Sequence, residues 1–159
     1  MKIVTLLFLV KRTDGNISDI CLAMKKRGFG VGRWNGVGGK VSEGETIEAA
    51  AIREAQEEIC VTPRNIKKVA ELFFTFPINP AINHHAHTYI CEEWEGEPAE
   101  SEEMKPQWYK ISDIPYAQMW PDDKFWLPMV LEGKIVKNYT TFGEKDVIVE
   151  QRVEIVSSL

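Results

Sequence analysis

The sequence predicts one α+β domain over residues 1–159, with a mixed central β-sheet flanked by helices in an α/β/α sandwich. Many short apolar runs separated by turn residues accompany only two helical segments, which is typical of this class. No internal repeat or low-complexity linker divides the chain. Its 159 residues, 44% of them hydrophobic, are enough for one packed domain and too few for two ordinary ones.

The first two predicted elements are antiparallel strands. Residues 3–10 and 18–24 are apolar, and the turn sequence TDGN lies between them. The run at 3–10 is too short for a membrane span and is followed at once by Lys11 and Arg12. We therefore interpret it as a buried strand and expect neither an export signal nor a membrane anchor.

A basic, glycine-rich loop is predicted next, followed by a helix. Residues 21–40 contain five cationic side chains, no acidic one, and six of the eleven glycines. Such a loop is usually a flexible, solvated connection. Residues 46–59 have neither Gly nor Pro and fit a helix, capped by Thr46 or Ser42.

The remaining elements follow in the same way. Residues 69–76, 87–94 and 105–111 read as strands, and a second helix is expected from Asp122 to Gly133. Residues 134–142 and 146–155, separated by GEKD, predict a closing hairpin.

Charge and cysteine content limit the function. The net charge is −5, so a long nucleic acid would not be attracted. The three cysteines show no CxxC spacing, which disfavours both a disulfide framework and a zinc site. We therefore expect a cytoplasmic protein that acts on a small molecule, without polymeric nucleic acid as partner. No apolar segment is long enough for a membrane partner, and a monomer is expected because no extra interface segment is evident.

The helix at 46–59 carries a crowded acidic face. At 100° per residue, Glu54, Glu57 and Glu58 fall within an arc of about 100°, and Ile52 and Ile59 lie well away from them. An exposed acidic face is the usual meaning of such a pattern. Carboxylate clusters also suit Mg²⁺ or Mn²⁺, and the preceding loop offers backbone NH groups and positive charge for phosphate oxygens.

The segment GGKVSEGETIEAAAIREAQEEICV resembles the signature of the Nudix hydrolase family. Eight of its nine defined positions match, and only the last glycine is replaced, by Cys60; the matching residues are Gly39, Glu45, Arg53, Glu54, Ala55, Glu57, Glu58 and Val61. The resemblance implies a Nudix fold and Mg²⁺-dependent hydrolysis of a nucleoside diphosphate linked to another group. It implies Glu54, Glu57 and Glu58 as metal ligands and catalytic residues. Glu58 or a neighbour would activate water, and Arg53 and Glu45 would orient the helix.

Segments outside the signature are similar to Nudix hydrolases of oxidised purine nucleoside triphosphates such as 8-oxo-dGTP and 2-hydroxy-dATP. They are MKKRGFGVGRWNGVGGKV, FFTF, AESEEMKPQW and MWPDDKFWLP. The resemblance implies Gly38, through its carbonyl, and Glu103 as further metal ligands. The implied substrate-binding residues are Thr5, Lys25, Phe29, Asn35, Phe74, Phe76, Trp120, Asp122 and Asp123. Release of the monophosphate and pyrophosphate would keep damaged nucleotides out of DNA.

The aspartate pair also has a physical interpretation of its own. Beside Trp120, Asp122 and Asp123 would be partly desolvated, which raises the pKa of at least one of them. A protonated carboxyl donates as well as accepts, so the pair suits more than one oxidised base. Taken alone, two aspartates at this position more commonly mark a helix N-terminus.

Three further points remain open in the sequence. The substrate could instead be ADP-ribose or a dinucleoside polyphosphate, or the protein could be a non-catalytic nucleotide-binding module; the intact glutamates disfavour the module. His84, His85 and His87 give no ligand geometry, and a short motif of this kind seldom binds metal. Cys60 should cost about 1 kcal/mol if it takes the left-handed conformation that glycine favours.

Overall fold

The strands and helices predicted from the sequence occur in the expected order, and the structure adds three short strands. The structure, a computed structural model, describes all residues 1–159. The helices are α1 (Ile47–Ile59) and α2 (Asp123–Leu131), with single 3₁₀ turns at Pro80–Ile82, Ile111–Asp113, Tyr116–Gln118 and Glu144–Asp146. The strands are β1 (Lys2–Thr13), β2 (Asn16–Lys25), β3 (Trp34–Asn35), β4 (Thr62–Arg64), β5 (Lys67–Thr75), β6 (His84–Cys91), β7 (Glu93–Glu95), β8 (Met104–Lys110), β9 (Ile135–Phe142) and β10 (Ile148–Val156).

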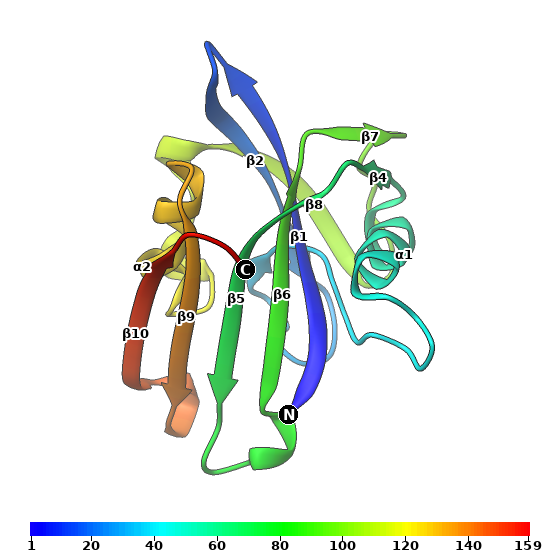
Figure 1. Ribbon diagram of the computed structural model, residues 1–159. Coiled ribbons are helices and arrows are strands. Elements are labelled where there is room, and N and C mark those ends of the chain that lie inside the picture. The colour runs from blue at the N-terminus through cyan, green and yellow to red at the C-terminus, as the bar shows by residue number, and fades with distance from the viewer.

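One mixed sheet forms the centre of the molecule, with α1 and α2 on its two sides (Figure 1). Its order is β10-β9-β5-β6-β1-β2-β3, and β8 pairs with β2; β4 and β7 form a separate two-stranded sheet. β1 is parallel to β6, and β5 is parallel to β9. The other pairs in this sheet are antiparallel. The predicted mixed sheet flanked by helices is therefore confirmed.

Alternation along β1 builds a hydrophobic core on each face of the sheet. Phe8 and Val10 belong to the larger core, which also contains Trp126 of α2. Leu7 and Leu9 point to the other face and pack in the core that includes Ala55 of α1. Since successive side chains of a strand point to opposite faces, one strand supports both layers.

The β1–β2 hairpin is longer than predicted. Thr13 pairs with Asn16, so only Asp14 and Gly15 form the turn, with φ of 53° and 82°. Two central residues with positive φ match the right-handed twist of the strands, and Asp-Gly is favoured there. The first and last residues of the turn sequence TDGN therefore belong to the two strands.

Helix α1 begins and ends as its sequence indicates. The Thr46 side chain accepts a hydrogen bond from the Ala49 backbone N at 3.1 Å, so Thr46 and not Ser42 is the N-cap. At the other end Cys60 has φ 65° and ψ 27°, and its N–H donates to the Gln56 carbonyl. The left-handed cap expected for the family's glycine is therefore present, but with a cysteine in it.

The end of the basic loop is not a flexible connection, which corrects the sequence interpretation. Residues 36–40 run beside β1: the Thr5 N–H donates to the Gly39 carbonyl at 2.9 Å, and Leu7 and Val37 exchange backbone hydrogen bonds. A Cβ on Gly38 would lie 1.8 Å from the Thr5 carbonyl oxygen. Glycine is required there because the two backbones approach so closely.

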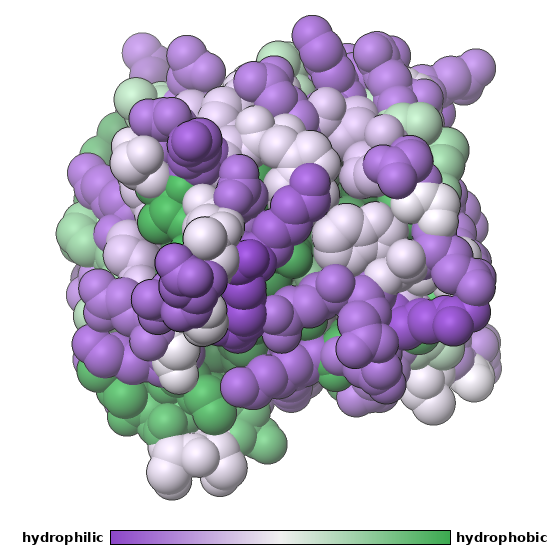
Figure 2. Space-filling view, turned by 90° about the horizontal axis from the view of Figure 1, so that it is seen from above, coloured by the Kyte–Doolittle hydropathy of each residue, from purple (hydrophilic) through white to green (hydrophobic).

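The surface seen from above in Figure 2 is mostly hydrophilic, with smaller apolar areas near its edges. This agrees with a chain in which 27% of the residues are charged. None of the helices has both the length and the apolar character that a membrane crossing requires.

Candidate functional site

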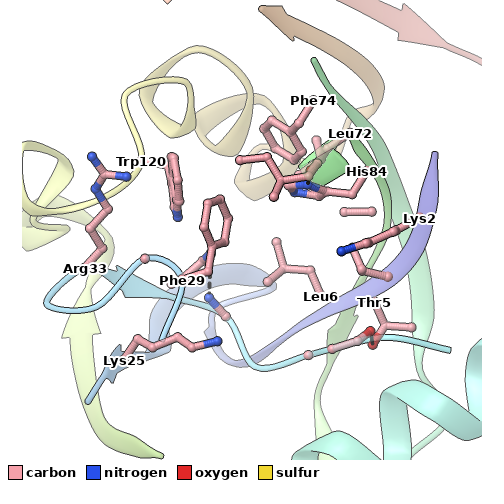
Figure 3. Close-up of a pocket in the computed structure, with 18 of the residues that line it drawn as sticks. Lys2, Thr5, Leu6, Lys25, Phe29, Arg33, Leu72, Phe74, His84 and Trp120 are labelled. Carbon is pink, nitrogen blue, oxygen red and sulfur yellow. Dashed lines mark hydrogen bonds between the residues drawn. The ribbon is translucent and has the colours of Figure 1, made fainter. Parts of the chain in front are cut away.

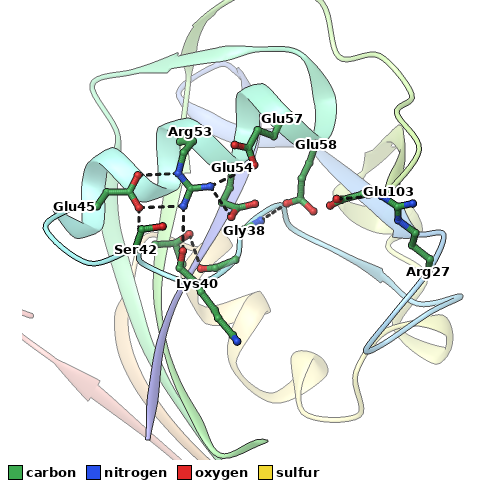
Figure 4. A network of polar contacts seen from close by, with 12 residues as sticks. Arg27, Gly38, Lys40, Ser42, Glu45, Arg53, Glu54, Glu57, Glu58 and Glu103 are labelled. Carbon is green, nitrogen blue, oxygen red and sulfur yellow. Dashed lines mark hydrogen bonds and ion pairs between the residues drawn. The ribbon is translucent and has the colours of Figure 1, made fainter.

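Helix α1 presents its acidic residues toward the glycine loop. Glu58 is buried, with 2% exposure, and accepts a hydrogen bond from the Gly38 backbone N at 2.8 Å (Figure 4). The side chain of Glu54 is also largely covered, whereas that of Glu57 is 59% exposed. Glu103 comes from the segment before β8 and pairs loosely with Arg27, at 3.4 Å. The structure thus brings together acids that lie far apart in the sequence.

Arg53 ties this helix to the loop before it. Its guanidinium donates to both carboxylate oxygens of Glu45, at 2.7 and 3.0 Å, and to the Lys40 carbonyl at 3.1 Å. It also reaches Glu54 at 3.0 Å. The bonds from Arg53 lower the pKa of Glu45 to about 2. This geometry supports the predicted role of Arg53 and Glu45 in orienting the helix. A bidentate ion pair fixes both the distance between the two side chains and their relative orientation.

Burial and mutual repulsion make this cluster suited to a divalent cation. Burial, together with the charges of Glu54 and Glu103, raises the pKa of Glu58 to about 8. Burial likewise raises the pKa of Glu54, to which Glu57 and Glu103 contribute. Crowded carboxylates of this kind are stabilised when a hard cation binds their oxygens. The residues therefore fit a divalent metal ion, and Gly38 of the glycine loop lies beside them, with its backbone N 2.8 Å from Glu58 Oε1.

A cavity of about 340 Å³ lies next to the acids, on the α2 side of the sheet. Nine predicted residues line it: Thr5, Lys25, Phe29, Asn35, Gly38, Phe74, Phe76, Trp120 and Asp123. Phe29 and Trp120 stand together at a ring distance of 5.1 Å, and Phe74 faces them across the opening (Figure 3). This volume and an aromatic wall suit a small planar ligand.

Asp122 and Asp123 are both buried at the start of α2. The Asp122 carboxylate accepts from Asn138 Nδ2 at 3.1 Å, and Asp123 accepts from Trp126 Nε1 at 3.1 Å. One oxygen of each, Asp122 Oδ1 and Asp123 Oδ2, has no partner. Asp123 lines the cavity but Asp122 does not, so Asp123 alone of the two can contact a ligand directly in this arrangement.

Burial raises the pKa of both aspartates, as the sequence predicts for at least one. For Asp122 the pKa rises to about 7, and for Asp123 it rises well above its usual range, where the charge of Asp122 adds to the effect of burial. The two carboxyls titrate as a coupled pair. A proton shared by the pair turns one acceptor into a donor.

The sequence reasoning missed several cavity residues: Lys2, Arg33, Lys40, Leu72, His84 and Phe142. The Arg33 guanidinium lies 4.0 Å from the Trp120 ring centre and pairs with Asp146 at 3.0 Å. The basic loop in the sequence indicated that Arg33 could lie near a ligand, but the sequence could not indicate that Arg33 stacks on Trp120. Asn138, which holds Asp122, comes from β9 and had no signal at all.

His84 enters the cavity wall as an uncharged ring. Its centroid lies 4.7 Å from that of Phe74, and burial lowers its pKa. Its Nδ1 lies 2.8 Å from the Ile82 carbonyl, which only accepts, so Nδ1 carries the proton. The other nitrogen, Nε2, is therefore an acceptor.

Comparison with known proteins agrees with this geometry. Residues 1–130 match the NUDIX domain family. The chain belongs to the Nudix family. A zebrafish (Danio rerio) relative, named oxidized purine nucleoside triphosphate hydrolase, is 44% identical over 158 residues, covering 99% of this chain and 97% of the relative. A mouse (Mus musculus) relative of the same name is 43% identical over 139 residues, covering 87% and 88%.

The Nudix assignment confirms the resemblance found in the sequence, and the relatives' names agree with the predicted hydrolase class. A solved structure of a MutT protein from Bacillus halodurans has a TM-score of 0.83 and 23% identity, covering 97% of this chain and 98% of that one. It confirms the Nudix fold. Nudix hydrolases generally use a divalent metal, which is consistent with the carboxylate cluster on α1.

Proposed function

We propose that this Nudix protein hydrolyses oxidised purine nucleoside triphosphates, such as 8-oxo-dGTP and 2-hydroxy-dATP, to the monophosphate and pyrophosphate. One observation carries the proposal: an aromatic cavity with a buried, incompletely paired carboxyl in its wall adjoins a carboxylate cluster on the family's signature helix. The names of the zebrafish and mouse relatives support the substrate class.

Base recognition would combine stacking with a small set of polar groups. Phe29, Trp120 and Phe74 offer ring faces to a purine. Asn35 Oδ1 already accepts from the Gly36 backbone N at 2.8 Å, so its amide NH₂ remains available as a donor. Asp123 Oδ2 is unpartnered and donates or accepts according to its protonation. Asp122 acts through its coupling with Asp123, because it does not line the cavity.

The phosphates would extend toward the glycine loop. Lys2, Lys25 and Lys40 line this cavity and bring positive charge to it, and Thr5 adds a hydroxyl group. Cationic side chains and loop NH groups are suitable partners for non-bridging phosphate oxygens. The chain of phosphates would then reach from the base cavity to Glu54 and Glu58.

The acids would hold a divalent cation, for which we propose Mg²⁺ with Mn²⁺ as a substitute. Glu54, Glu57, Glu58, Glu103 and the Gly38 carbonyl are the proposed ligands. When bound, the cation supplies charge withdrawal from the phosphates and a more acidic water. Glu58 or an adjacent glutamate accepts the proton of the attacking water, and its burial beside Gly38 fixes that carboxylate in place. Arg53 keeps Glu54 and the helix in register with the loop.

The whole chain is proposed to act as one domain and as a monomer in the cytoplasm. The family match ends at residue 130, yet Asn138 and Phe142 of β9 contribute to the aspartate pair and to the cavity. This contribution supports a single functional unit that includes the last two strands. Light scattering on a sizing column would test the monomer.

The test is a substrate panel with Mg²⁺, in which pyrophosphate release is measured from 8-oxo-dGTP, 2-hydroxy-dATP and dGTP, and AMP release is measured from ADP-ribose. We expect the oxidised purine triphosphates to give the highest kcat/KM, and Glu58→Gln to lose at least about 100-fold in kcat. Asp122→Asn and Asp123→Asn should change the preference among bases. Faster turnover of ADP-ribose, or full activity of Glu58→Gln, would reject the proposal.

A further inference from the structure

We propose that Glu71, His85 and His87 form a binding site for a transition-metal ion of the Zn²⁺ class, on the face of the sheet opposite the nucleotide cavity. This site is separate from the carboxylate cluster of α1 and does not depend on the proposed hydrolysis.

The three side chains belong to two neighbouring strands. Glu71 on β5 is paired directly with His87 on β6, and His85 lies two positions earlier on the same strand. Residues two apart on a strand share a face, so all three project to the same side. Their ligand atoms lie within 4.8 Å of one another, and Nε2 of His85 is 2.7 Å from Glu71 Oε1. Strands hold such a constellation more rigidly than loops do.

This face is not the one that carries the aromatic base cavity of our proposal. Leu72 and Ala86, which alternate with Glu71, His85 and His87 along β5 and β6, line the nucleotide cavity. The three ligands therefore point away from the cavity, toward the side of the sheet that carries α1.

His87 gives the independent indication of a ligand. It is 8% exposed, yet its Nδ1 has no hydrogen-bond partner. A buried polar group without a partner destabilises a protein by about 1 to 3 kcal/mol, so such an atom needs an explanation. The His85 ring lies 4.2 Å from the His87 ring, centre to centre.

The ligand set indicates the class of metal. Imidazole nitrogens favour Zn²⁺ and similar ions over Mg²⁺, and two histidines with one glutamate are a known zinc ligand set that leaves a fourth position open. In a tetrahedral site with bonds of about 2.1 Å, ligand atoms lie about 3.4 Å apart, so small side-chain rotations suffice. The ion would replace the hydrogen bond between His85 and Glu71. Lys68, whose Nζ is 3.4 Å from Glu71 Oε2, would turn to solvent.

The test must separate this site from the acids of α1. We would titrate the purified protein with Co²⁺ and with Zn²⁺ in a large excess of Mg²⁺, which occupies oxygen-rich sites. Co²⁺ bound with nitrogen ligands in a tetrahedral site gives a strong visible absorption that octahedral oxygen sites lack. We expect one Co²⁺ per chain with that spectrum, and a Zn²⁺-dependent rise in Tm.

The variants make the assignment specific. His85→Ala, His87→Ala and Glu71→Gln should each weaken Zn²⁺ binding by at least about tenfold, while His84→Ala, the adjacent histidine outside the cluster, should keep it. Circular dichroism checks that each variant folds; because His87 is buried, the more exposed Glu71→Gln decides the matter if His87→Ala does not fold. Absence of the tetrahedral spectrum, retention of binding in Glu71→Gln and His85→Ala, or its loss in His84→Ala or Glu58→Gln would overturn the inference.

Discussion

Gly39→Ala should impair the proposed metal site without unfolding the protein. A Cβ at residue 39 would lie 2.5 Å from Glu54 Oε1, 2.6 Å from Cδ and 2.9 Å from Oε2. Ordinary contact begins near 3.4 Å, so the carboxylate would have to retreat by about 0.9 Å (3.4 − 2.5). A misplacement of about 1 Å in a catalytic group costs up to about 100-fold in rate. We therefore expect kcat/KM to fall by about 10- to 100-fold.

The stability of this variant should change little. The obstacle is the end of a flexible side chain rather than backbone, and alanine restricts the unfolded chain by about 0.4 to 1 kcal/mol. Because 1 kcal/mol corresponds to about 2 to 4 °C in a chain of this size, Tm should stay within about 3 °C of the wild type. Gly38→Ala is the contrast, since its Cβ would meet the Thr5 backbone oxygen at 1.8 Å and should lower Tm strongly.

The assay is a double-mutant cycle on Mn²⁺ affinity, kcat/KM and Tm with Gly39→Ala, Glu54→Gln and the double variant. If the alanine acts through Glu54, it should weaken Mn²⁺ binding in the wild type and have less than about a twofold effect once Glu54 is replaced. Equal losses in both backgrounds, or full activity of Gly39→Ala, would refute the reasoning.

Three other predictions follow from particular residues. Cys60→Gly should raise Tm by about 1 to 4 °C in thermal unfolding, because glycine relieves the left-handed cap, whereas Cys60→Ala should not; equal gains would show that the thiol and not the backbone matters. The raised pKa values of Asp122 and Asp123 mean that the folded state holds protons that the unfolded state has lost. Their contribution to stability is therefore full below about pH 3.8 and is lost as the pH rises toward 7 and beyond. Denaturant unfolding of the Asp122→Asn/Asp123→Asn variant should show a smaller decline than the wild type, and an identical slope would contradict the raised values. His84→Phe keeps the aromatic packing but removes the accepting nitrogen Nε2. If Nε2 accepts a hydrogen bond from the substrate, KM for 8-oxo-dGTP should rise about 5- to 10-fold with kcat little changed. An unchanged KM for every substrate of the panel would exclude a contact between His84 and the substrate.

Local patterns were sufficient for α1 and for the β1–β2 hairpin. The helix depends on spacing that is readable within one segment, from its Thr46 cap to the position of Cys60. The hairpin is set by two turn residues, although its full length was not predicted. β3, β4 and β7 were missed because two or three residues give no period, and β4 and β7 pair with each other across a long stretch of chain.

Contacts at the site between residues far apart in the chain could not be predicted from the sequence, because they depend on how distant strands pair. Parallel pairing of β9 with β5 brings Asn138 against Asp122, and no short-range signal encodes that contact. The interpretation of Asp122 and Asp123 as base readers came from a resemblance, and the structure adds that only Asp123 reaches the cavity. The histidine motif was treated as one group, but strand alternation divides it between the two faces of the sheet.

The contact between Asn138 and Asp122 depends on a residue at the edge of the sheet. Gln151 on β10 donates to Asn138 Oδ1 at 2.5 Å, which orients the amide so that its NH₂ faces Asp122. A polar relay thus leads from an edge strand to the carboxyl pair. In the proposed role of the aspartate pair as base reader, substitutions at Gln151 would reorient that amide and shift the base preference, while the glutamates of α1 stay unchanged. Base selectivity and hydrolytic chemistry would then depend on separate parts of the fold.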